Sequence, residues 1–145
     1  MPAKVSPVRL ASPTRLLAGG AGLILAALLA TAATLSPDER GFGTHEQLGL
    51  GPCTFADCCG VRCPSCGMTT AWSWLLHGRP EKALATHAVG TLLGAAAVLG
   101  AVWLGVAAIG GQWRWLAPSE AQALWSLAAV VMAGLVEWAV RLTAG

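Results

Sequence analysis

The sequence predicts an all-α integral membrane protein with two to three transmembrane helices, a cysteine-rich loop and a short interfacial helix. Its composition supports this fold class: 55% of the residues are hydrophobic, only 11% are charged, and the mean hydropathy is +0.62. Ordinary soluble domains carry roughly 25% charged residues. The apolar residues also gather in long runs, as membrane spans require. With 145 residues, the chain is expected to form one domain.

The first long run, residues 16–35, has no charged residue and follows Lys4, Arg9 and Arg15. About 20 residues of α-helix cross the hydrocarbon core of a bilayer. A cleaved signal peptide is the alternative, but its apolar region is usually only about 7–15 residues long, which favours an uncleaved signal anchor. The predicted segments are a basic N-terminal tail (1–15), a first transmembrane helix (16–35), a cysteine-rich loop (36–87) with an interfacial helix (68–77), a second transmembrane helix (88–109) and a third (119–141).

The second and third runs carry features of helix packing. Gly90 and Gly94 are four residues apart, a spacing that lets another helix approach closely. The partner helix could come from this chain or from another membrane protein. Glu137 in the third run is a candidate functional carboxylate because charges inside membranes are costly. Arg141 lies one helical turn later, so we expect the two to form an ion pair near the interface.

Charge indicates a lipid partner and argues against nucleic acid. The formal net charge is only +2, and the basic residues are scattered along the chain. Lys4, Arg9 and Arg15 precede the first helix, which by the positive-inside rule predicts a cytoplasmic N-terminus. The cysteine loop would then face the exoplasmic side of the cell membrane, where disulfides are permitted.

All five cysteines fall within residues 53–66, and this cluster is the main chemical feature of the sequence. Cys63-Pro-Ser-Cys66 precedes a short segment in which apolar residues recur at helical spacing. The pair is therefore expected at the start of a helix that lies at the membrane interface. The cysteines are Cys53, Cys58, Cys59, Cys63 and Cys66.

This segment resembles a bacterial membrane family catalogued as domain of unknown function 2752. The pattern of the family is Cys-Pro-x-Cys-Gly-x-Thr-Arg, and it also has an earlier cysteine, for which Cys53 stands ten residues before Cys63. The matching residues of the motif are Cys63, Pro64, Cys66, Gly67 and Thr69.

The resemblance covers about residues 53–89 and includes two departures from the family pattern. Thr70 replaces the usual arginine, and His87-Ala88 stands where an Asn-Pro pair is common. Membership would imply an architecture of a few membrane helices. It implies no settled activity, so the resemblance does not name a substrate.

A structural role is the first interpretation of the cysteines. The sulfurs of a Cys-x-x-Cys turn can bind one tetrahedral zinc ion. Cys63 and Cys66 would supply two ligands and Cys53 a third, with His77 as the preferred fourth ligand. The other candidates for completing the set are Cys58, Cys59 and His87. Alternatively, Cys53, Cys58, Cys59, Cys63 and Cys66 form disulfides, although adjacent Cys58 and Cys59 would strain a bond to each other.

Thiol–disulfide exchange is the enzymatic interpretation. A thiol at a helix N-terminus has a lowered pKa, which would make Cys63 the nucleophile and Cys66 the resolving cysteine. No thioredoxin-like strand–helix pattern surrounds the pair. In a third interpretation, the loop and the helix that bears Trp72 and Trp74 dock a membrane protein partner.

We predict a structural or accessory membrane subunit whose cysteine cluster holds zinc or disulfides, with thiol–disulfide exchange by Cys63 and Cys66 as the alternative. An enzyme is the less favoured class. The sequence contains no Ser-His-Asp arrangement, phosphate-binding glycine loop or paired carboxylates at credible spacing, so a hydrolase or kinase is not supported.

Overall fold

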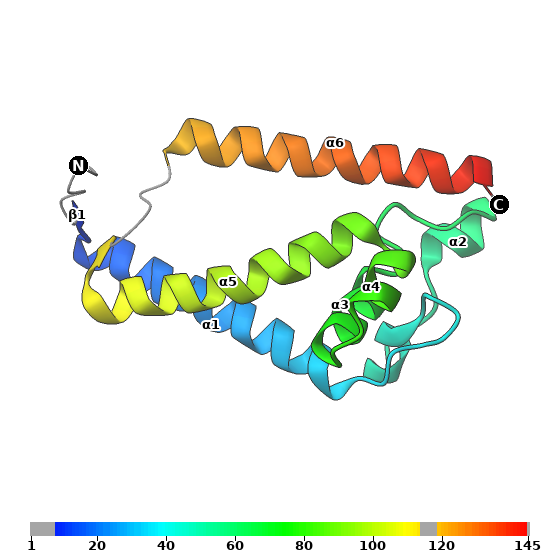
Figure 1. Ribbon diagram of the computed structural model, residues 1–145, viewed down its shortest axis with the longest axis horizontal. Helices are drawn as coiled ribbons and strands as arrows, with labels where there is room; N and C mark the ends of the chain where they lie inside the picture. The colour runs from blue at the N-terminus through cyan, green and yellow to red at the C-terminus, as the bar shows by residue number, and fades with distance from the viewer. Residues whose placement is uncertain (1–7, 114–118, 145) are drawn as a thin grey trace.

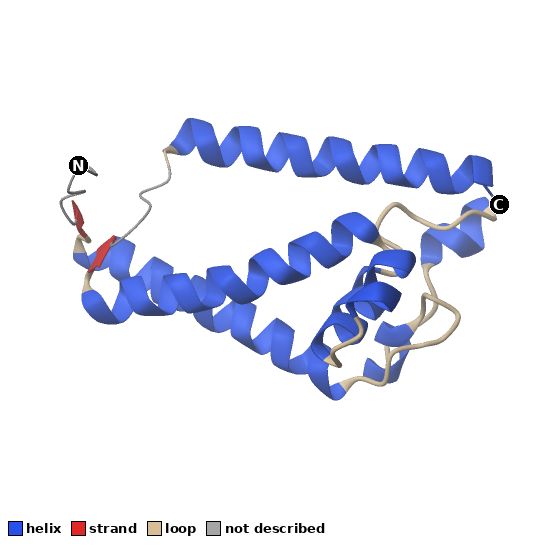
Figure 2. Ribbon diagram, viewed as in Figure 1, coloured by secondary structure: helices blue, strands red, loops and turns tan. Residues whose placement is uncertain are grey.

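The computed structural model describes residues 8–113 and 119–144, and it is built almost entirely of helices (Figures 1 and 2). Residues 1–7 of the predicted basic tail lie outside the described residues. The all-α fold class predicted from the sequence is confirmed. The elements are β1 (Val8–Arg9), α1 (Ser12–Thr34), the 3-10 helix η1 (Thr44–Leu48), α2 (Thr54–Cys59), α3 (Met68–Leu76), α4 (Pro80–Thr86), α5 (Ala88–Gly110), β2 (Gln112–Trp113) and α6 (Glu120–Ala144).

Helices α1, α5 and α6 are each long and apolar enough to cross a membrane. Their large apolar side chains point outward, where lipid would surround them: Leu23 is 74% exposed, Ile109 82% and Trp125 77%. In water such surfaces would be unfavourable. The three helices therefore fit a multi-pass membrane protein.

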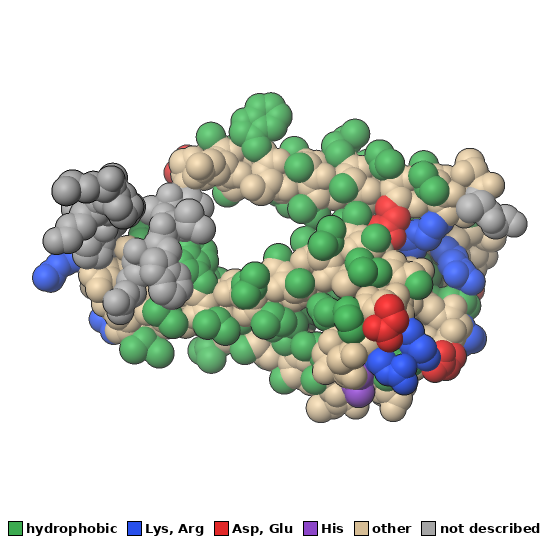
Figure 3. Space-filling model, in the orientation of Figure 1, with side chains coloured by type: hydrophobic (Ala, Val, Ile, Leu, Met, Phe, Trp, Pro, Cys, Tyr) green, Lys and Arg blue, Asp and Glu red, His purple; other side chains and the backbone are tan. Residues whose placement is uncertain are grey.

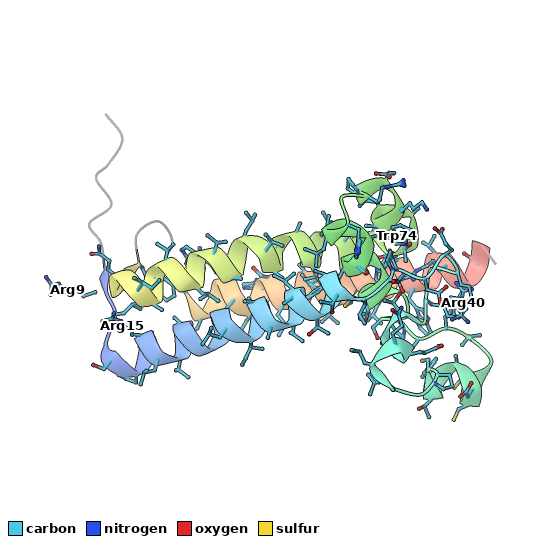
Figure 4. All side chains as sticks on the ribbon, turned by 90° about the horizontal axis from the view of Figure 1, so that it is seen from below. Arg9, Arg15, Arg40 and Trp74 are labelled. Carbon is cyan, nitrogen blue, oxygen red and sulfur yellow. The ribbon has the colours of Figure 1, made fainter. Side chains whose placement is uncertain are left out.

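Helices α1 and α5 lie side by side and run in opposite directions (Figures 1 and 4). Small residues allow the close approach, since a Cβ atom added at Gly22 would lie 3.3 Å from the Cβ of Leu104. Beyond this pair, β1 and β2 form a two-stranded antiparallel ladder that pairs Arg9 with Gln112. The ladder joins the start of α1 to the end of α5.

Helix α3 packs across the start of α5 at the two glycines that the sequence singled out. Gly90 faces Met68, and Gly94 faces Trp72 and Leu75. The indole Nε1 of Trp72 donates a 2.8 Å hydrogen bond to the carbonyl oxygen of Gly90. The predicted close approach at these glycines is thus made by a helix of the same chain.

Both ends of α5 are capped by charged side chains of the other two long helices. The guanidinium of Arg15 in α1 donates to the carbonyl oxygens of Ala108 and Ile109, the latter at 3.0 Å. The carboxylate of Glu137 in α6 accepts hydrogen bonds of 2.8 Å from the N–H groups of Ala88 and Val89. Each charge opposes the partial charge of the helix end that it meets, so both contacts stabilise α5.

Charged groups occupy the two ends of the molecule and leave an apolar zone between them. In Figure 3 the acidic and basic side chains of this face gather mainly over the end that carries α2, α3 and α4. Figure 4 shows Arg9 and Arg15 at one end of the long helices and Arg40 and Trp74 at the other. This layout is what a bilayer requires of a spanning protein.

Replacing Gly94 with alanine should destabilise the protein by about 1–3 kcal/mol, the usual cost of overpacking. The added Cβ would lie 3.0 Å from Cδ1 of Trp72 and 3.1 Å from Cδ2 of Leu75. Thermal unfolding in detergent, followed by circular dichroism, measures the effect. Gly105→Ala is the matched control, because an added Cβ there meets no atom within 4 Å. Equal midpoints for the two variants would contradict the packing described above.

Glu137→Gln should lower the free energy of unfolding by about 1–3 kcal/mol, because the amide keeps the volume of the side chain but loses its charge towards the α5 N-terminus. Chemical unfolding in detergent provides the measurement. Glu120→Gln removes a carboxylate from an exposed position at the start of the same helix and should leave stability nearly unchanged. If both variants lost the same stability, the cap would have no specific role.

Candidate functional site

The Cys63–Cys66 segment forms a tight turn that leads into α3. The N–H of Cys66 donates to the carbonyl oxygen of Cys63 at 3.0 Å. Gly67 follows with φ +94°, and a Cβ atom there would lie only 2.7 Å from the carbonyl oxygen of Gly41. Glycine is required at this position for both reasons. This contact gives a physical reason for the glycine of the motif.

Three side chains from distant parts of the chain hold this turn by its carbonyl groups. The ring Nε2 of His87 lies 3.1 Å from the oxygen of Pro64. Arg141 donates a 3.2 Å hydrogen bond to the oxygen of Cys66, and Trp138 donates one of 2.7 Å to the oxygen of Arg62. Helix α6 and the start of α5 thus position the cysteine turn without any contribution from sulfur.

Glu137 contacts both His87 and Arg141. Oε2 of Glu137 lies 3.0 Å from Nδ1 of His87, whose side chain is 1% exposed, and Oε1 lies 3.4 Å from the Arg141 guanidinium. The expected Glu137–Arg141 ion pair is therefore present. Sequence reasoning did not find the role of His87, because residues 87 and 137 are far apart in the chain and nothing in the local pattern pairs them.

A buried pair of hydroxyls fastens η1 to α3. The Oγ1 atoms of Thr44 and Thr70 lie 2.8 Å apart, and both residues are buried. Thr44 also accepts a 3.0 Å hydrogen bond from the N–H of Asp38. Thr70 therefore helps to pack the loop against α3.

A cavity of about 570 Å³ opens beside the cysteine turn, at the end of α1. Its size lies within the range of small-molecule sites, roughly 300–1,000 Å³. One wall is the end of α1 with its C-cap, from Leu28 to Leu35, and another includes Leu48 at the end of η1 and Leu50 in the loop after it. The polar residues of the lining are Thr31, His45, Ser65, Thr69, Thr70 and Trp72, and its sulfur-bearing residues are Cys53, Cys63, Cys66 and Met68.

Three thiols share this cavity in different environments. The backbone N–H of Ala56, and after it the Cys63 thiol, lower the pKa of the Cys53 thiol. Ala56 lies in the first turn of α2, three residues after Cys53, so its N–H favours the thiolate over the thiol. Burial raises the pKa of the Cys66 thiol, and the neighbouring Cys63 and Cys53 add to this effect. The Cys63 sulfur lies 3.5 Å from the hydroxyl oxygen of Ser65.

The remaining candidate residues lie away from Cys53, Cys63 and Cys66. Cys58 and Cys59 are exposed on α2 and do not line the cavity. His77 lies at the C-terminal end of the nine-residue helix α3, about 13 Å along the axis from its start, and its Nδ1 is 2.8 Å from the oxygen of Ser73. Within residues 8–113 and 119–144, no group of three or more His, Cys, Asp or Glu side chains is placed to hold a metal ion.

The chain is a small helical protein with three helices long and apolar enough to span a membrane. Three of its thiols line a cavity at the end of α1. The family model described as "Protein of unknown function (DUF2752)" matches residues 53–103. This match confirms the family resemblance predicted from the sequence. It spans the cysteine loop from Cys53 and most of α5, but neither α1 nor α6. No curated protein and no solved structure matches the chain.

Cys53 should react with iodoacetamide at a lower pH than Cys66, because only the thiolate is nucleophilic. The direction follows from the two environments, which lower the pKa of Cys53 and raise that of Cys66. Alkylation of the reduced protein in detergent across a pH series, read by peptide mass spectrometry, measures both rates. A denatured sample is the control, and there the two profiles should converge. Coincident profiles in the folded protein would contradict the assignment.

Proposed function

We propose that the chain is a membrane thiol–disulfide oxidoreductase in which Cys53 and Cys63 form the exchanging pair. The observation that carries the proposal is the meeting of Cys53, Cys63 and Cys66 on one cavity, in surroundings that shift the pKa values of Cys53 and Cys66 in opposite directions. Environments that push the pKa values of neighbouring groups apart are typical of reactive sites.

The proposed roles differ from those that the sequence motif alone indicates. Cys53 rather than Cys63 has the environment of a nucleophile, since its thiolate is favoured by nearby donors. Cys66 is buried and its pKa is raised, so it is suited to remain a thiol that donates to the other sulfurs. Cys63 lies beside both other thiols: the Cys-x-x-Cys turn brings it to Cys66, and its thiol acts on the Cys53 thiol.

The reaction is an exchange of two electrons between dithiols. With the Cys53–Cys63 disulfide formed, a thiolate of the substrate attacks the sulfur of Cys53, and Cys63 leaves as a thiolate that takes up a proton. The second substrate thiolate attacks the mixed disulfide at the substrate sulfur. A substrate disulfide forms, and Cys53 leaves reduced. One disulfide is thus made for each one broken.

The proposed orientation suits this chemistry. Lys4 and Arg9 precede α1 and Arg15 lies in its first turn, which by the positive-inside rule favours a cytoplasmic N-terminus and an exoplasmic cysteine loop. Thiols on that side meet an oxidising environment and substrates that form disulfides.

A structural or accessory role, with zinc or disulfides as the staple of the loop, is supported less well. The cysteine turn is already held through its carbonyl groups by His87, Trp138 and Arg141. His77, the preferred fourth zinc ligand, lies at the opposite end of α3 from Cys66. The position of the turn is therefore explained without zinc or disulfides.

Cys53→Ser and Cys63→Ser should each remain folded but lose the two-electron transition of the protein. Titration of detergent-purified protein in glutathione redox buffers, followed by thiol-directed mass tags, measures the transition. Cys58→Ser is the matched control, because Cys58 is exposed and outside the cavity, and this variant should keep the transition. A wild-type protein whose Cys53 and Cys63 stay unpaired throughout the titration would sink the proposal, as would unfolding of both variants under reducing conditions.

A further inference from the structure

We propose that the cavity beside Cys53, Cys63 and Cys66 binds the ring of an isoprenoid quinone, which accepts the electrons of the cysteine pair. The inference rests on the proposed thiol–disulfide function and adds the oxidant that such a function needs. Each exchange leaves Cys53 and Cys63 reduced, so an electron acceptor must restore their disulfide before the next cycle.

The position of the cavity indicates that its occupant comes from lipid. Leu28, Thr31 and Leu35 lie in the last two turns of α1 and at its C-cap, where this helix would leave the bilayer. Leu48 at the end of η1 and Leu50 after it also line the cavity, and they are 49% and 56% exposed. Apolar side chains on both sides of an opening at the membrane boundary favour an apolar ligand that diffuses within the bilayer.

The residues that line the cavity favour a quinone ring over a lipid chain. A lipid chain would need only the apolar walls, and it would have no use for three thiols. A quinone ring uses both the apolar walls and the thiols, since it is flat and apolar yet reacts with thiolates. His45 and Thr69 also line the cavity, and their side chains carry hydrogen-bond donors of the kind that quinone oxygens accept.

The electron balance of the proposed step is complete. The Cys53 thiolate adds to the quinone ring, the Cys63 sulfur then attacks the Cys53 sulfur, and the hydroquinone leaves. One S–S bond forms, two S–H bonds are lost, and the quinone gains two electrons and two protons as two O–H groups. Cys53 and Cys63 are then ready to oxidise another dithiol.

The test uses the full chain in detergent, reduced with dithiothreitol and freed of it, with decyl-ubiquinone as the probe. We expect the wild-type protein to consume about one quinone per chain, measured by loss of quinone absorbance, while thiol tagging shows that Cys53 and Cys63 become protected. A wild type that forms this disulfide in glutathione buffers but leaves the quinone unreduced would overturn the quinone site alone. A wild type that does neither would overturn the thiol function as well.

Leu28→Trp should slow quinone reduction at least tenfold, because the larger side chain takes up space in the cavity that Leu28 lines. Leu23→Trp, on the exposed side of α1 and outside the lining, is the matched control and should react as the wild type does. Equal rates for both variants would place the reaction elsewhere. Photolabelling of the wild type with an azidoquinone provides a test independent of folding: label on residues 28–72 supports the cavity, and label confined to α6 contradicts it.

Discussion

The capping of α5 at both ends by charges from its neighbours is the constraint on which the rest of the structure depends. Helix ends carry unpaired N–H and C=O groups, and leaving them unpaired near hydrocarbon costs several kcal/mol each in general. Arg15 of α1 meets the C-terminal carbonyls, and Glu137 of α6 meets the N-terminal amides. These two contacts set the position of α1 and α6 along α5, and with it the distance between the two polar ends of the molecule.

The same carboxylate connects the membrane helices to the thiol site. Glu137 contacts His87 and Arg141, and these residues hold the carbonyls of Pro64 and Cys66. The turn that carries Cys63 and Cys66 is therefore positioned by α6, a helix far away in sequence. This support fixes the position of Cys63, one member of the proposed Cys53–Cys63 pair, beside the cavity that Cys53 also lines.

Local patterns predicted much of this protein but could not predict which side chains meet. The long apolar runs predicted an all-helical membrane fold, because length and hydrophobicity suffice for that inference. The glycine spacing at Gly90 and Gly94 predicted close helix packing, although only the structure identified α3 as the neighbour. The motif favoured Cys63 as nucleophile, whereas the donors around Cys53 come from Ala56 and from the approach of Cys63.

By itself, the sequence determined that the chain forms long apolar helices and that all its thiols lie in one loop. It also placed Glu137 and Arg141 one helical turn apart, so their ion pair could be foreseen. Only the tertiary structure decided that His87 joins this pair and that Cys53, Cys63 and Cys66 line one cavity while His77 lies outside it. The physical reason is separation along the sequence. Helix formation and i, i+4 pairing depend on near neighbours, whereas the thiol site depends on how the ends of α1, α5 and α6 pack together.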